Sequence, residues 1–246
     1  MELEPAARAA ILAHARRLAA LDPPEEAAGV IANARYIPLE NIARDRSRGF
    51  ALDDIHLKTE GIEAIVHSHP GGPAYPSGHD MRQQIGCGVP WLVAVAPTAS
   101  RPDCPEEVFG FGGVPKLDLS CGYRHGVDDC YSLIRGYYQT HHGITLPDVP
   151  RPWEWWHDGL DLYTDGLGPA GFRRLPPGAA LAPGDVFLAR VRAPVVNHAG
   201  VWLGDGLILH HLGGASGHQP ERLPRKEPAE RWLKFIDGWA RHQPPA

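Results

Sequence analysis

Residues 67–80 read HSHPGGPAYPSGHD, and the first half of the chain is organised around them. They follow residues 62–66 (IEAIV), a short apolar run that predicts a buried strand. Side chains on a strand alternate between its two faces, so His67 and His69 should point the same way. The end of this strand therefore presents two imidazoles to one side of a sheet.

A carboxylate follows these histidines at close range. The loop 70–76 is rich in glycine and proline and can turn the chain back sharply. Ser77 and Asp80 then have the spacing of a capped helix start, with Ser77 as the N-cap. Two imidazoles and a nearby carboxylate suit a catalytic zinc ion with one open coordination position. The alternative is a histidine pair that ends a strand, followed by a helix cap with a purely structural role.

The stretch resembles the motif of the JAMM (MPN-plus) metalloproteases, His-x-His-Pro followed after six residues by Ser-x-x-Asp. Every position of that motif is filled. The resemblance implies that His67, His69 and Asp80 are zinc ligands. It also implies that Ser77 helps to hold the oxyanion of the tetrahedral intermediate.

The same resemblance implies an upstream glutamate as general base, in a Glu-x-x-Gly context before a strand. Residues 26–29 (EAAG) fit this context, which favours Glu26 over Glu25.

Composition limits the class of protein. The chain has 246 residues, of which 43% are hydrophobic and 22% charged, as expected for a globular protein of one large or two small domains. A formal charge of −5 gives no electrostatic footprint for nucleic acid.

There is no apolar run long enough for a transmembrane helix. The N-terminus lacks a signal-peptide pattern, so we expect synthesis in the cytoplasm. The four cysteines predict neither a zinc knuckle nor a disulfide framework.

The first half predicts alternating helices and strands that end near residue 115. We expect helices over residues 6–21 and 78–87, and strands over residues 29–38, 50–53, 62–66, 91–96 and 109–113. The second half predicts a helix that starts near Cys130 and ends at Gly143. Loop-rich residues 144–180 follow, then strands over residues 184–191, 197–203 and 206–212, and an amphipathic tail over residues 228–241.

A second group of reactive side chains lies in this half. Cys130 is predicted at a helix N-terminus, where the helix dipole stabilises a thiolate. Asp128 and Asp129 oppose that effect, so a histidine must supply most of the activation. His198 is the candidate base, and His210, twelve residues later across a hairpin, is placed to orient it. The alternative is a buried structural cysteine with two unrelated histidines.

This half resembles the NlpC-type papain-like cysteine peptidases of peptidoglycan. The resemblance covers residues 129–133 (DCYSL), residues 198–201 (HAGV) and residues 123–126 (YRHG). It implies a triad of Cys130, His198 and His210, with His211 the less favoured neighbour because it should face the other side. The chain departs from the family at Tyr131, where the cell-wall enzymes usually have serine.

The two resemblances together define an α+β protein of two domains. Residues 1–114 would be a JAMM-type α/β sandwich (cytidine-deaminase-like), and residues 115–246 a papain-like NlpC-type domain. The combination is similar to a family of tail-tip assembly proteins of lambda-like phages. It implies a phage or prophage protein with zinc-dependent peptide or isopeptide hydrolysis in one half and hydrolysis of peptidoglycan stem peptides in the other.

The same combination implies other tail-tip proteins as partners and a place in or at the phage tail tip. Two alternatives are a structural tail-tip component with one or both sites silent, and a cellular JAMM isopeptidase.

Overall fold

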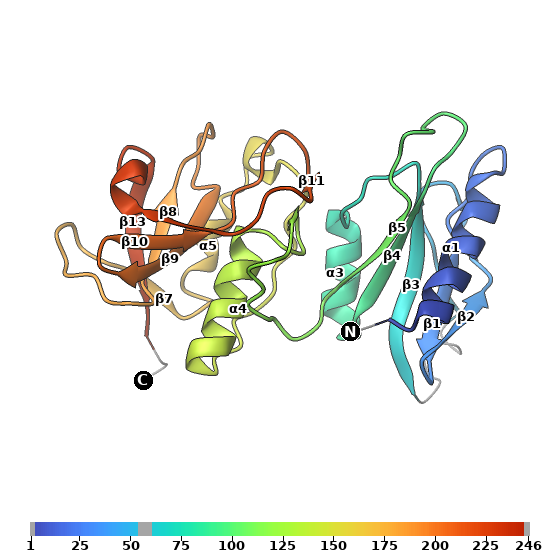
Figure 1. Cartoon of the computed structure of the whole chain (residues 1–246), viewed down its shortest axis with the longest axis horizontal. Coiled ribbons are helices and arrows are strands. Elements are labelled where there is room, and N and C mark those ends of the chain that lie inside the picture. Colours follow the sequence, from blue (N-terminus) through green and yellow to red (C-terminus); the bar gives the residue numbers. More distant parts are fainter. Residues whose placement is uncertain (1–2, 54–60, 244–246) are drawn as a thin grey trace. The chain divides into compact units, whose positions relative to one another are not determined.

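The computed structural model describes residues 3–53 and 61–243. The chain forms two compact units, residues 1–113 and residues 114–246 (Figure 1). Both units combine helices with a sheet, which confirms the predicted α+β class. The outermost residues of the two predicted domains, 1–2 and 244–246, lie outside the described part of the chain.

The N-terminal unit is a five-stranded sheet in the order β2-β1-β3-β4-β5. Its strands are β1 (Ala28–Ala32), β2 (Arg35–Leu39), β3 (Ile62–Pro70), β4 (Trp91–Ala96) and β5 (Glu107–Phe111). Only the central pair among these, β3 and β4, runs parallel. Helices α1 (Pro5–Ala19) and α3 (Gly78–Cys87) lie on opposite faces of the sheet (Figure 1).

Two strand predictions in this unit are wrong. Residues 29–38 form a hairpin and not one strand, because Asn33 and Ala34 both have positive φ angles (49° and 59°) and turn the chain. Two consecutive positive φ angles are typical of a tight hairpin turn. Alanine rarely adopts a positive φ angle, so residues 33–34 carry little signal for such a turn. Residues 50–53 form no strand.

The sheet separates the apolar core from the histidines. Small side chains of α1 pack on one face of the sheet, against Ala64 and Val66 of β3 among others. Alternation along β3 then directs His67 and His69 to the opposite face, where α3 lies.

The C-terminal unit has a six-stranded antiparallel sheet in the order β12-β10-β9-β8-β13-β7. Its strands are β7 (Phe172–Arg174), β8 (Val186–Ala189), β9 (His198–Gly204), β10 (Leu207–His210), β12 (Arg225–Pro228) and β13 (Ile236–His242). A two-stranded sheet joins β6 (Tyr123–Arg124) to β11 (His218–Gln219). The helical elements are α4 (Cys130–His142), η1 (Trp155–His157), α5 (Leu162–Gly166) and η2 (Ala229–Trp232).

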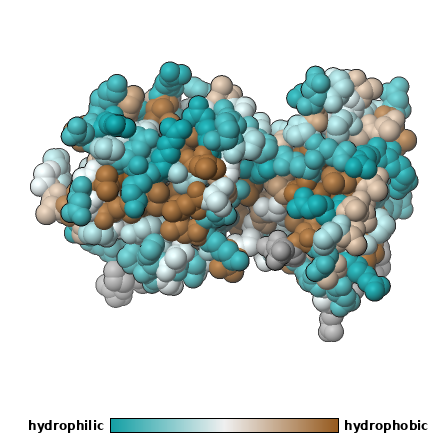
Figure 2. Space-filling model, viewed as in Figure 1, coloured by the Kyte–Doolittle hydropathy of each residue, from teal (hydrophilic) through white to brown (hydrophobic). Residues whose placement is uncertain are grey.

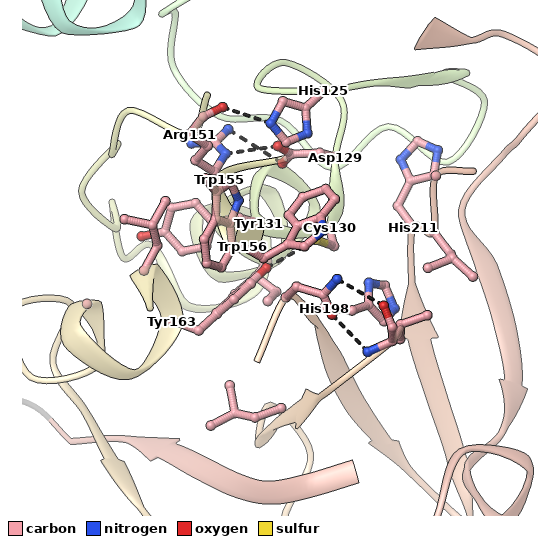
Figure 3. Close-up of a pocket in the computed structure, with 18 of the residues that line it drawn as sticks. His125, Asp129, Cys130, Tyr131, Arg151, Trp155, Trp156, Tyr163, His198 and His211 are labelled. Atoms are coloured by element: carbon pink, nitrogen blue, oxygen red, sulfur yellow. Dashed lines mark hydrogen bonds and ion pairs between the residues drawn. The ribbon is translucent and has the colours of Figure 1, made fainter. Parts of the chain in front are cut away.

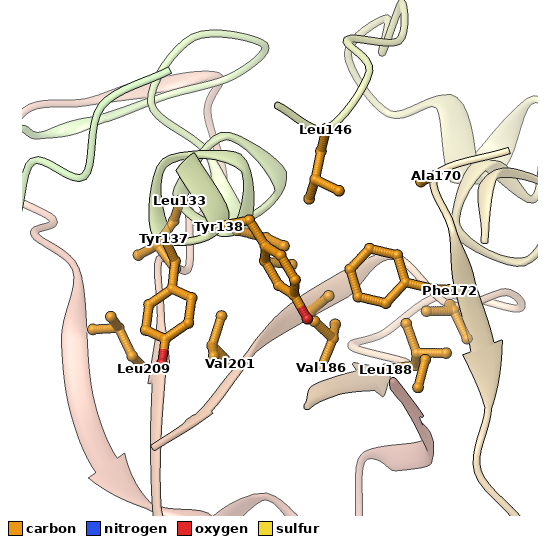
Figure 4. Close-up of a cluster of buried hydrophobic side chains, with 14 residues drawn as sticks. Leu133, Tyr137, Tyr138, Leu146, Ala170, Phe172, Val186, Leu188, Val201 and Leu209 are labelled. Carbon is orange, nitrogen blue, oxygen red and sulfur yellow. The ribbon is translucent and has the colours of Figure 1, made fainter. Parts of the chain in front are cut away.

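Helix α4 packs on the sheet through its apolar side. Leu133, Tyr137 and Tyr138 meet Val201 and Leu209 of the sheet in a buried cluster (Figure 4). The helix ends at Gly143, which has the predicted left-handed conformation (φ 66°). This packing fixes the helix axis and therefore the position of Cys130 at its first turn.

The predicted apolar side of the tail packs on the other face of this sheet. Trp232, Phe235, Ile236 and Trp239 all join a cluster around Phe187. On the face shown in Figure 2, hydrophilic and hydrophobic residues are interspersed on both units. Among residues 3–53 and 61–243, no helix is long and apolar enough to cross a membrane.

Candidate active sites

His67, His69 and Asp80 form a compact buried cluster in the N-terminal unit. Nε2 of His67 lies 3.1 Å from Nε2 of His69 and 3.5 Å from Oδ1 of Asp80. Nε2 of His69 lies 3.4 Å from Oδ2 of Asp80. The three side chains therefore direct their ligand atoms at one point.

The arrangement fits a tetrahedral metal ion. Ligand atoms about 2.0–2.1 Å from zinc at tetrahedral angles lie about 3.3 Å apart, close to the observed separations. Nδ1 of His69 donates to the carbonyl of Pro73 at 2.8 Å, which leaves the lone pair of Nε2 facing the cluster. Three converging ligands leave one position of a tetrahedron open, as in catalytic zinc sites.

Helix α3 holds the carboxylate in place. The Ser77 hydroxyl accepts from the Asp80 backbone N–H at 3.1 Å, and the Asp80 carboxylate accepts from the Ser77 backbone N–H at 2.7 Å. Burial raises the pKa of Asp80, but its interactions with His67 and His69 outweigh burial and hold the pKa well below its usual range. Ser77 thus forms the capping box that the sequence predicts, and its hydroxyl hydrogen is left to donate elsewhere.

Glu26 lies beside this cluster. Strand β1 pairs with β3 so that Ala28 lies opposite His67. If this antiparallel register is continued by two residues, back from Ala28 and forward from His67, Glu26 lies opposite His69. Burial raises the pKa of Glu26 to about 7, while the nearby His69 lowers it. A carboxylate with such a pKa exchanges protons readily at neutral pH.

Other nearby glutamates point elsewhere. Glu25 lies 4.0 Å from Nη1 of Arg46, and Glu63 accepts from the backbone N–H of Ala34 at 3.1 Å. Glu26, by contrast, lies close enough to His69 for the imidazole to lower its pKa against the larger effect of burial.

Two residues that sequence reasoning missed hold the backbone around Glu26. The buried Asn41 donates to the Glu26 carbonyl at 3.0 Å and accepts from the N–H groups of Ala43 and Ala51. Ser68, between the two histidines, accepts from the N–H of Ala27 at 2.7 Å. No local pattern signals either contact, because each joins segments distant in the sequence.

A third missed residue contacts a candidate ligand directly. Phe50 stacks on His67 with ring centroids 4.5 Å apart and an interplanar angle of 11°. The loop that carries it is held by Asn41, which also donates to the carbonyl of Gly49. The stacked ring covers one side of the His67 imidazole.

Cys130 opens helix α4 in the C-terminal unit. Its Sγ lies 3.1 Å from the Tyr163 hydroxyl and accepts a hydrogen bond from the backbone N–H of Ala199. Ala199 follows His198 directly on β9. Cys130, Tyr163 and His198 line one cavity of about 880 Å³ (Figure 3).

The two candidate histidines meet across the hairpin of β9 and β10. Nε2 of His198 lies 3.0 Å from Nδ1 of His210. Gly200 lies opposite His210, where a Cβ atom would be 2.6 Å from the His210 Cβ, so only glycine fits at this position. His211 points away from this pair, and its Nε2 donates to the Arg222 carbonyl at 2.8 Å.

Asp129 caps α4 and is neutralised by a residue that the sequence did not point to. Its carboxylate accepts from the N–H groups of Gly126 and Ser132, and from Nε of Arg151 at 2.9 Å. Burial raises the pKa of Asp129, but the charge of Arg151 reverses this and holds the pKa well below its usual range. Arg151 therefore offsets part of the opposing charge expected from Asp129, which still acts on Cys130.

The thiol itself is not ionised in the resting site. Burial, followed by the charge of Asp129, raises the pKa of Cys130 to about 11. Burial also lowers the pKa of His198 well below its ordinary value. The resting pair is thus a neutral thiol beside a neutral imidazole, and a proton must move when the sulfur attacks.

Aromatic side chains form much of the cavity wall. Trp155 is buried and packs at a tilt against Tyr163, while Trp153 and Trp156 line the cavity and are half-buried. The Tyr123 hydroxyl lies 3.3 Å from Nδ1 of His125 at the same cavity. Residues 153–156 therefore contribute three tryptophans to the cavity that Cys130 lines.

Two family models match the chain, one over most of each unit. Residues 5–108 match the model of prokaryotic homologues of the JAB domain, and residues 107–236 match the NlpC/P60 family. A desampylase from Haloferax volcanii is 33% identical over 103 residues, covering 35% of this chain and 74% of its own length.

Two phage proteins extend the likeness across both units. Tail tip assembly protein K of Escherichia phage lambda is 37% identical over 180 residues, 73% of this chain and 78% of its own. Its counterpart in Escherichia phage N15 is 31% identical over 227 residues, 87% of this chain and 86% of its own. With its JAB-type unit followed by an NlpC/P60 unit, the chain belongs to the family of tail tip assembly protein K.

Proposed function

We propose that this protein is a two-site peptidase of a phage or prophage that acts at the tail tip, together with other tail-tip proteins. The observation that carries the proposal is the presence of two complete sets of reactive side chains in separate units. One set is His67, His69 and Asp80. The other is Cys130 beside the His198–His210 pair. The phage K proteins, similar over most of the chain, support the setting.

In the N-terminal unit, His67, His69 and Asp80 would hold a zinc ion. Bound there, zinc would supply a Lewis acid for the hydrolysis of a peptide or isopeptide bond. Glu26 takes a proton from the attacking water and returns it to the leaving amine. Ser77 donates its hydroxyl hydrogen toward the developing oxyanion. The similar desampylase supports a hydrolytic role for this unit.

In the C-terminal unit, the Cys130 sulfur attacks the carbonyl of a peptidoglycan stem peptide. Nε2 of His198 is engaged with His210, so Nδ1 takes the thiol proton and gives it to the leaving amine. Water then hydrolyses the thioester, with His198 as base. The match to the NlpC/P60 family supports a stem peptide as the substrate.

Selective inactivation of the purified full chain tests the proposal. Cys130→Ala should lower the release of peptides from purified peptidoglycan by at least about a thousandfold. It should leave the bound zinc and the hydrolysis of isopeptide-linked substrates unchanged. A zinc chelator should do the reverse. Cys121→Ala, at another half-buried free cysteine, is the control.

Two outcomes would contradict the assignment. Peptidoglycan cleavage that survives Cys130→Ala but stops with the chelator would place both reactions at the metal cluster. Absence of turnover on every substrate, from protein that is folded and carries zinc, would favour a structural tail-tip component.

A further inference from the structure

His210 has one ring nitrogen with a partner and one without. Its Nδ1 meets Nε2 of His198 at 3.0 Å. Its Nε2 is buried with no hydrogen-bond partner among the described residues, and the residue is 1% exposed. An unsatisfied polar atom inside a protein is costly, so this nitrogen indicates a partner beyond the triad.

Proton positions in the proposed mechanism make this atom a donor. His198 receives the thiol proton at Nδ1, so in the resting state its own proton lies on Nε2. That proton is donated to Nδ1 of His210, which must then carry its proton on Nε2. The buried atom without a partner is therefore an N–H group that needs an acceptor.

Glu227 is placed to accept. Strand β12 pairs with β10 so that Glu227 lies opposite Ile208, which shares a sheet face with His210 two residues on. Oε1 of Glu227 lies 3.9 Å from Nε2 of His210. Its other oxygen, Oε2, accepts from Nε1 of Trp232 at 3.2 Å. One oxygen is thus anchored, and the other faces the histidine.

The charged and titratable groups around the pair leave this role to Glu227. Those that act on the two rings, besides the rings themselves, are Asp129, His211, Arg225 and Glu227. Asp129 is held by Arg151, and His211 donates to a backbone carbonyl. Arg225, whose Nη1 lies 3.8 Å from Oε1 of Glu227, has no acceptor atom to offer.

We propose that Glu227 is a positioning residue that extends the triad to a chain of Cys130, His198, His210 and Glu227. The proposal rests on the cysteine-peptidase function of this unit. The Glu227 carboxylate accepts the Nε2–H of His210 and so fixes the tautomer of that imidazole. The 3.9 Å between Oε1 of Glu227 and Nε2 of His210 shortens to a hydrogen bond when substrate binds. Its negative charge stabilises the positive charge that develops as His198 takes the Cys130 proton.

The kinetic test compares Glu227→Gln with Glu230→Gln in the full chain. Glutamine keeps an oxygen that can accept from Trp232 but removes the charge, and Glu230 is exposed on neighbouring η2. We expect Glu227→Gln to lower kcat for stem-peptide cleavage about ten- to a hundredfold with KM unchanged. The limb of the pH profile that reports the histidine pair should move to lower pH, because an imidazolium without its carboxylate loses its proton more easily. A profile and a rate equal to those of Glu230→Gln would overturn the proposal.

A measurement without substrate separates this proposal from the proposed function. Nitrogen-15 NMR of the labelled wild-type protein reports the tautomer of His210, and we expect the proton on Nε2. A proton on Nδ1 would overturn the role of Glu227 whether or not the protein cleaves peptides. Conversely, an Nε2–H tautomer that is lost in Glu227→Gln would support the role even if no wall substrate were turned over. The wild-type spectrum also decides the case if the variant does not fold.

Discussion

Each unit places a buried aspartate at the start of a helix, but the two carboxylates have different neighbours. Asp80 on α3 faces the Nε2 atoms of two histidines and accepts one backbone N–H. Asp129 on α4 accepts two backbone N–H groups and pairs with Arg151 at 2.9 Å. The second carboxylate is paired with a cation of the protein itself, whereas the first lies among ligand atoms that a bound cation would satisfy.

The same contrast holds for how each unit would activate its reaction. The N-terminal unit directs the ligand atoms of His67, His69 and Asp80 toward one point, where a metal ion would bind. The C-terminal unit keeps Cys130 and His198 neutral at rest and surrounds them with hydrogen bonds. The first site should therefore fail when a ligand is removed, and the second should change by smaller steps as single hydrogen bonds are lost.

The largest effect should follow removal of the two histidines of the first site. His67→Ala/His69→Ala should lose the zinc, which we expect at about one ion per chain, together with all hydrolysis by this unit. Elemental analysis of freshly purified protein measures the zinc. His79→Ala, an exposed histidine on the same helix start as Asp80, should keep it. Equal metal content in the double variant and the wild type would show that these histidines hold no metal. Asp80 would then not differ from Asp129 in belonging to a metal site.

The second largest effect should follow loss of the candidate general base, Glu26. Glu26→Gln should keep the zinc and lower kcat for isopeptide hydrolysis by about 10²–10⁴-fold, the usual contribution of a positioned general base. Glu25→Gln changes a neighbouring carboxylate that lies near Arg46 and should have little effect. If the two variants exchanged these phenotypes, Glu25 would be the base.

The third prediction concerns the compensated aspartate. Arg151→Met leaves Asp129 buried without its cation and should lower the free energy of unfolding of the C-terminal unit by about 3–5 kcal/mol. Arg174→Met, which breaks a more exposed pair with Asp237, should cost at most about 1 kcal/mol. Denaturant unfolding curves at pH 7 provide both values.

The pH dependence of this loss has a definite sign. In the wild type the pKa of Asp129 is depressed, so the stability from this group is present above its unfolded pKa of about 3.9 and is lost as the pH falls. Arg151→Met removes the largest cause that lowers this pKa and leaves burial, which raises it, so the variant should lose stability as the pH rises above about 4. Parallel stability curves for the two proteins between pH 4 and pH 7 would show that Arg151 is not the group that holds Asp129 ionised.

The sequence predicted what depends on local spacing. His67, His69 and Asp80 lie within fourteen consecutive positions, and strand alternation with a capped helix is enough to expect them together. His198 and His210 are joined by a hairpin, which tight-turn signals also predict. The α+β class, which the two family resemblances implied, is confirmed.

Contacts between distant segments could not be predicted in this way. Arg151 reaches the second site from a loop, Tyr163 from helix α5 and Glu227 from edge strand β12, and their neighbours in sequence carry no motif. The hairpin within residues 29–38 was missed because one of its two turn residues is alanine. The raised pKa of Cys130 depends on its burial, which only the folded chain shows.

The smallest predicted effect tests the single hydrogen bond from Tyr163 to the Cys130 sulfur. A hydroxyl that donates to the sulfur stabilises the thiolate more than the thiol, so it lowers the pKa of Cys130 against the larger effect of burial. Tyr163→Phe removes the donor while keeping the ring. The net worth of one hydrogen bond, about 0.5–1.5 kcal/mol, corresponds to a two- to tenfold slower alkylation of Cys130 by iodoacetamide at neutral pH. Mass spectrometry of the Cys130 peptide separates this rate from those of the other three cysteines.

Tyr131→Phe is the matched control, because that tyrosine lines the same cavity but donates to the carbonyl of Pro147. Slower alkylation in Tyr163→Phe alone would show that single hydrogen bonds change the reactivity of Cys130. The cluster of His67, His69 and Asp80 is instead expected to lose its function when one ligand is removed. Faster alkylation would mean that Tyr163 acts mainly by covering the sulfur, since removal of its hydroxyl would then expose the thiol more than it destabilises the thiolate. Equal rates in the two variants would leave the helix start and the Ala199 N–H as the groups that stabilise the attacking sulfur.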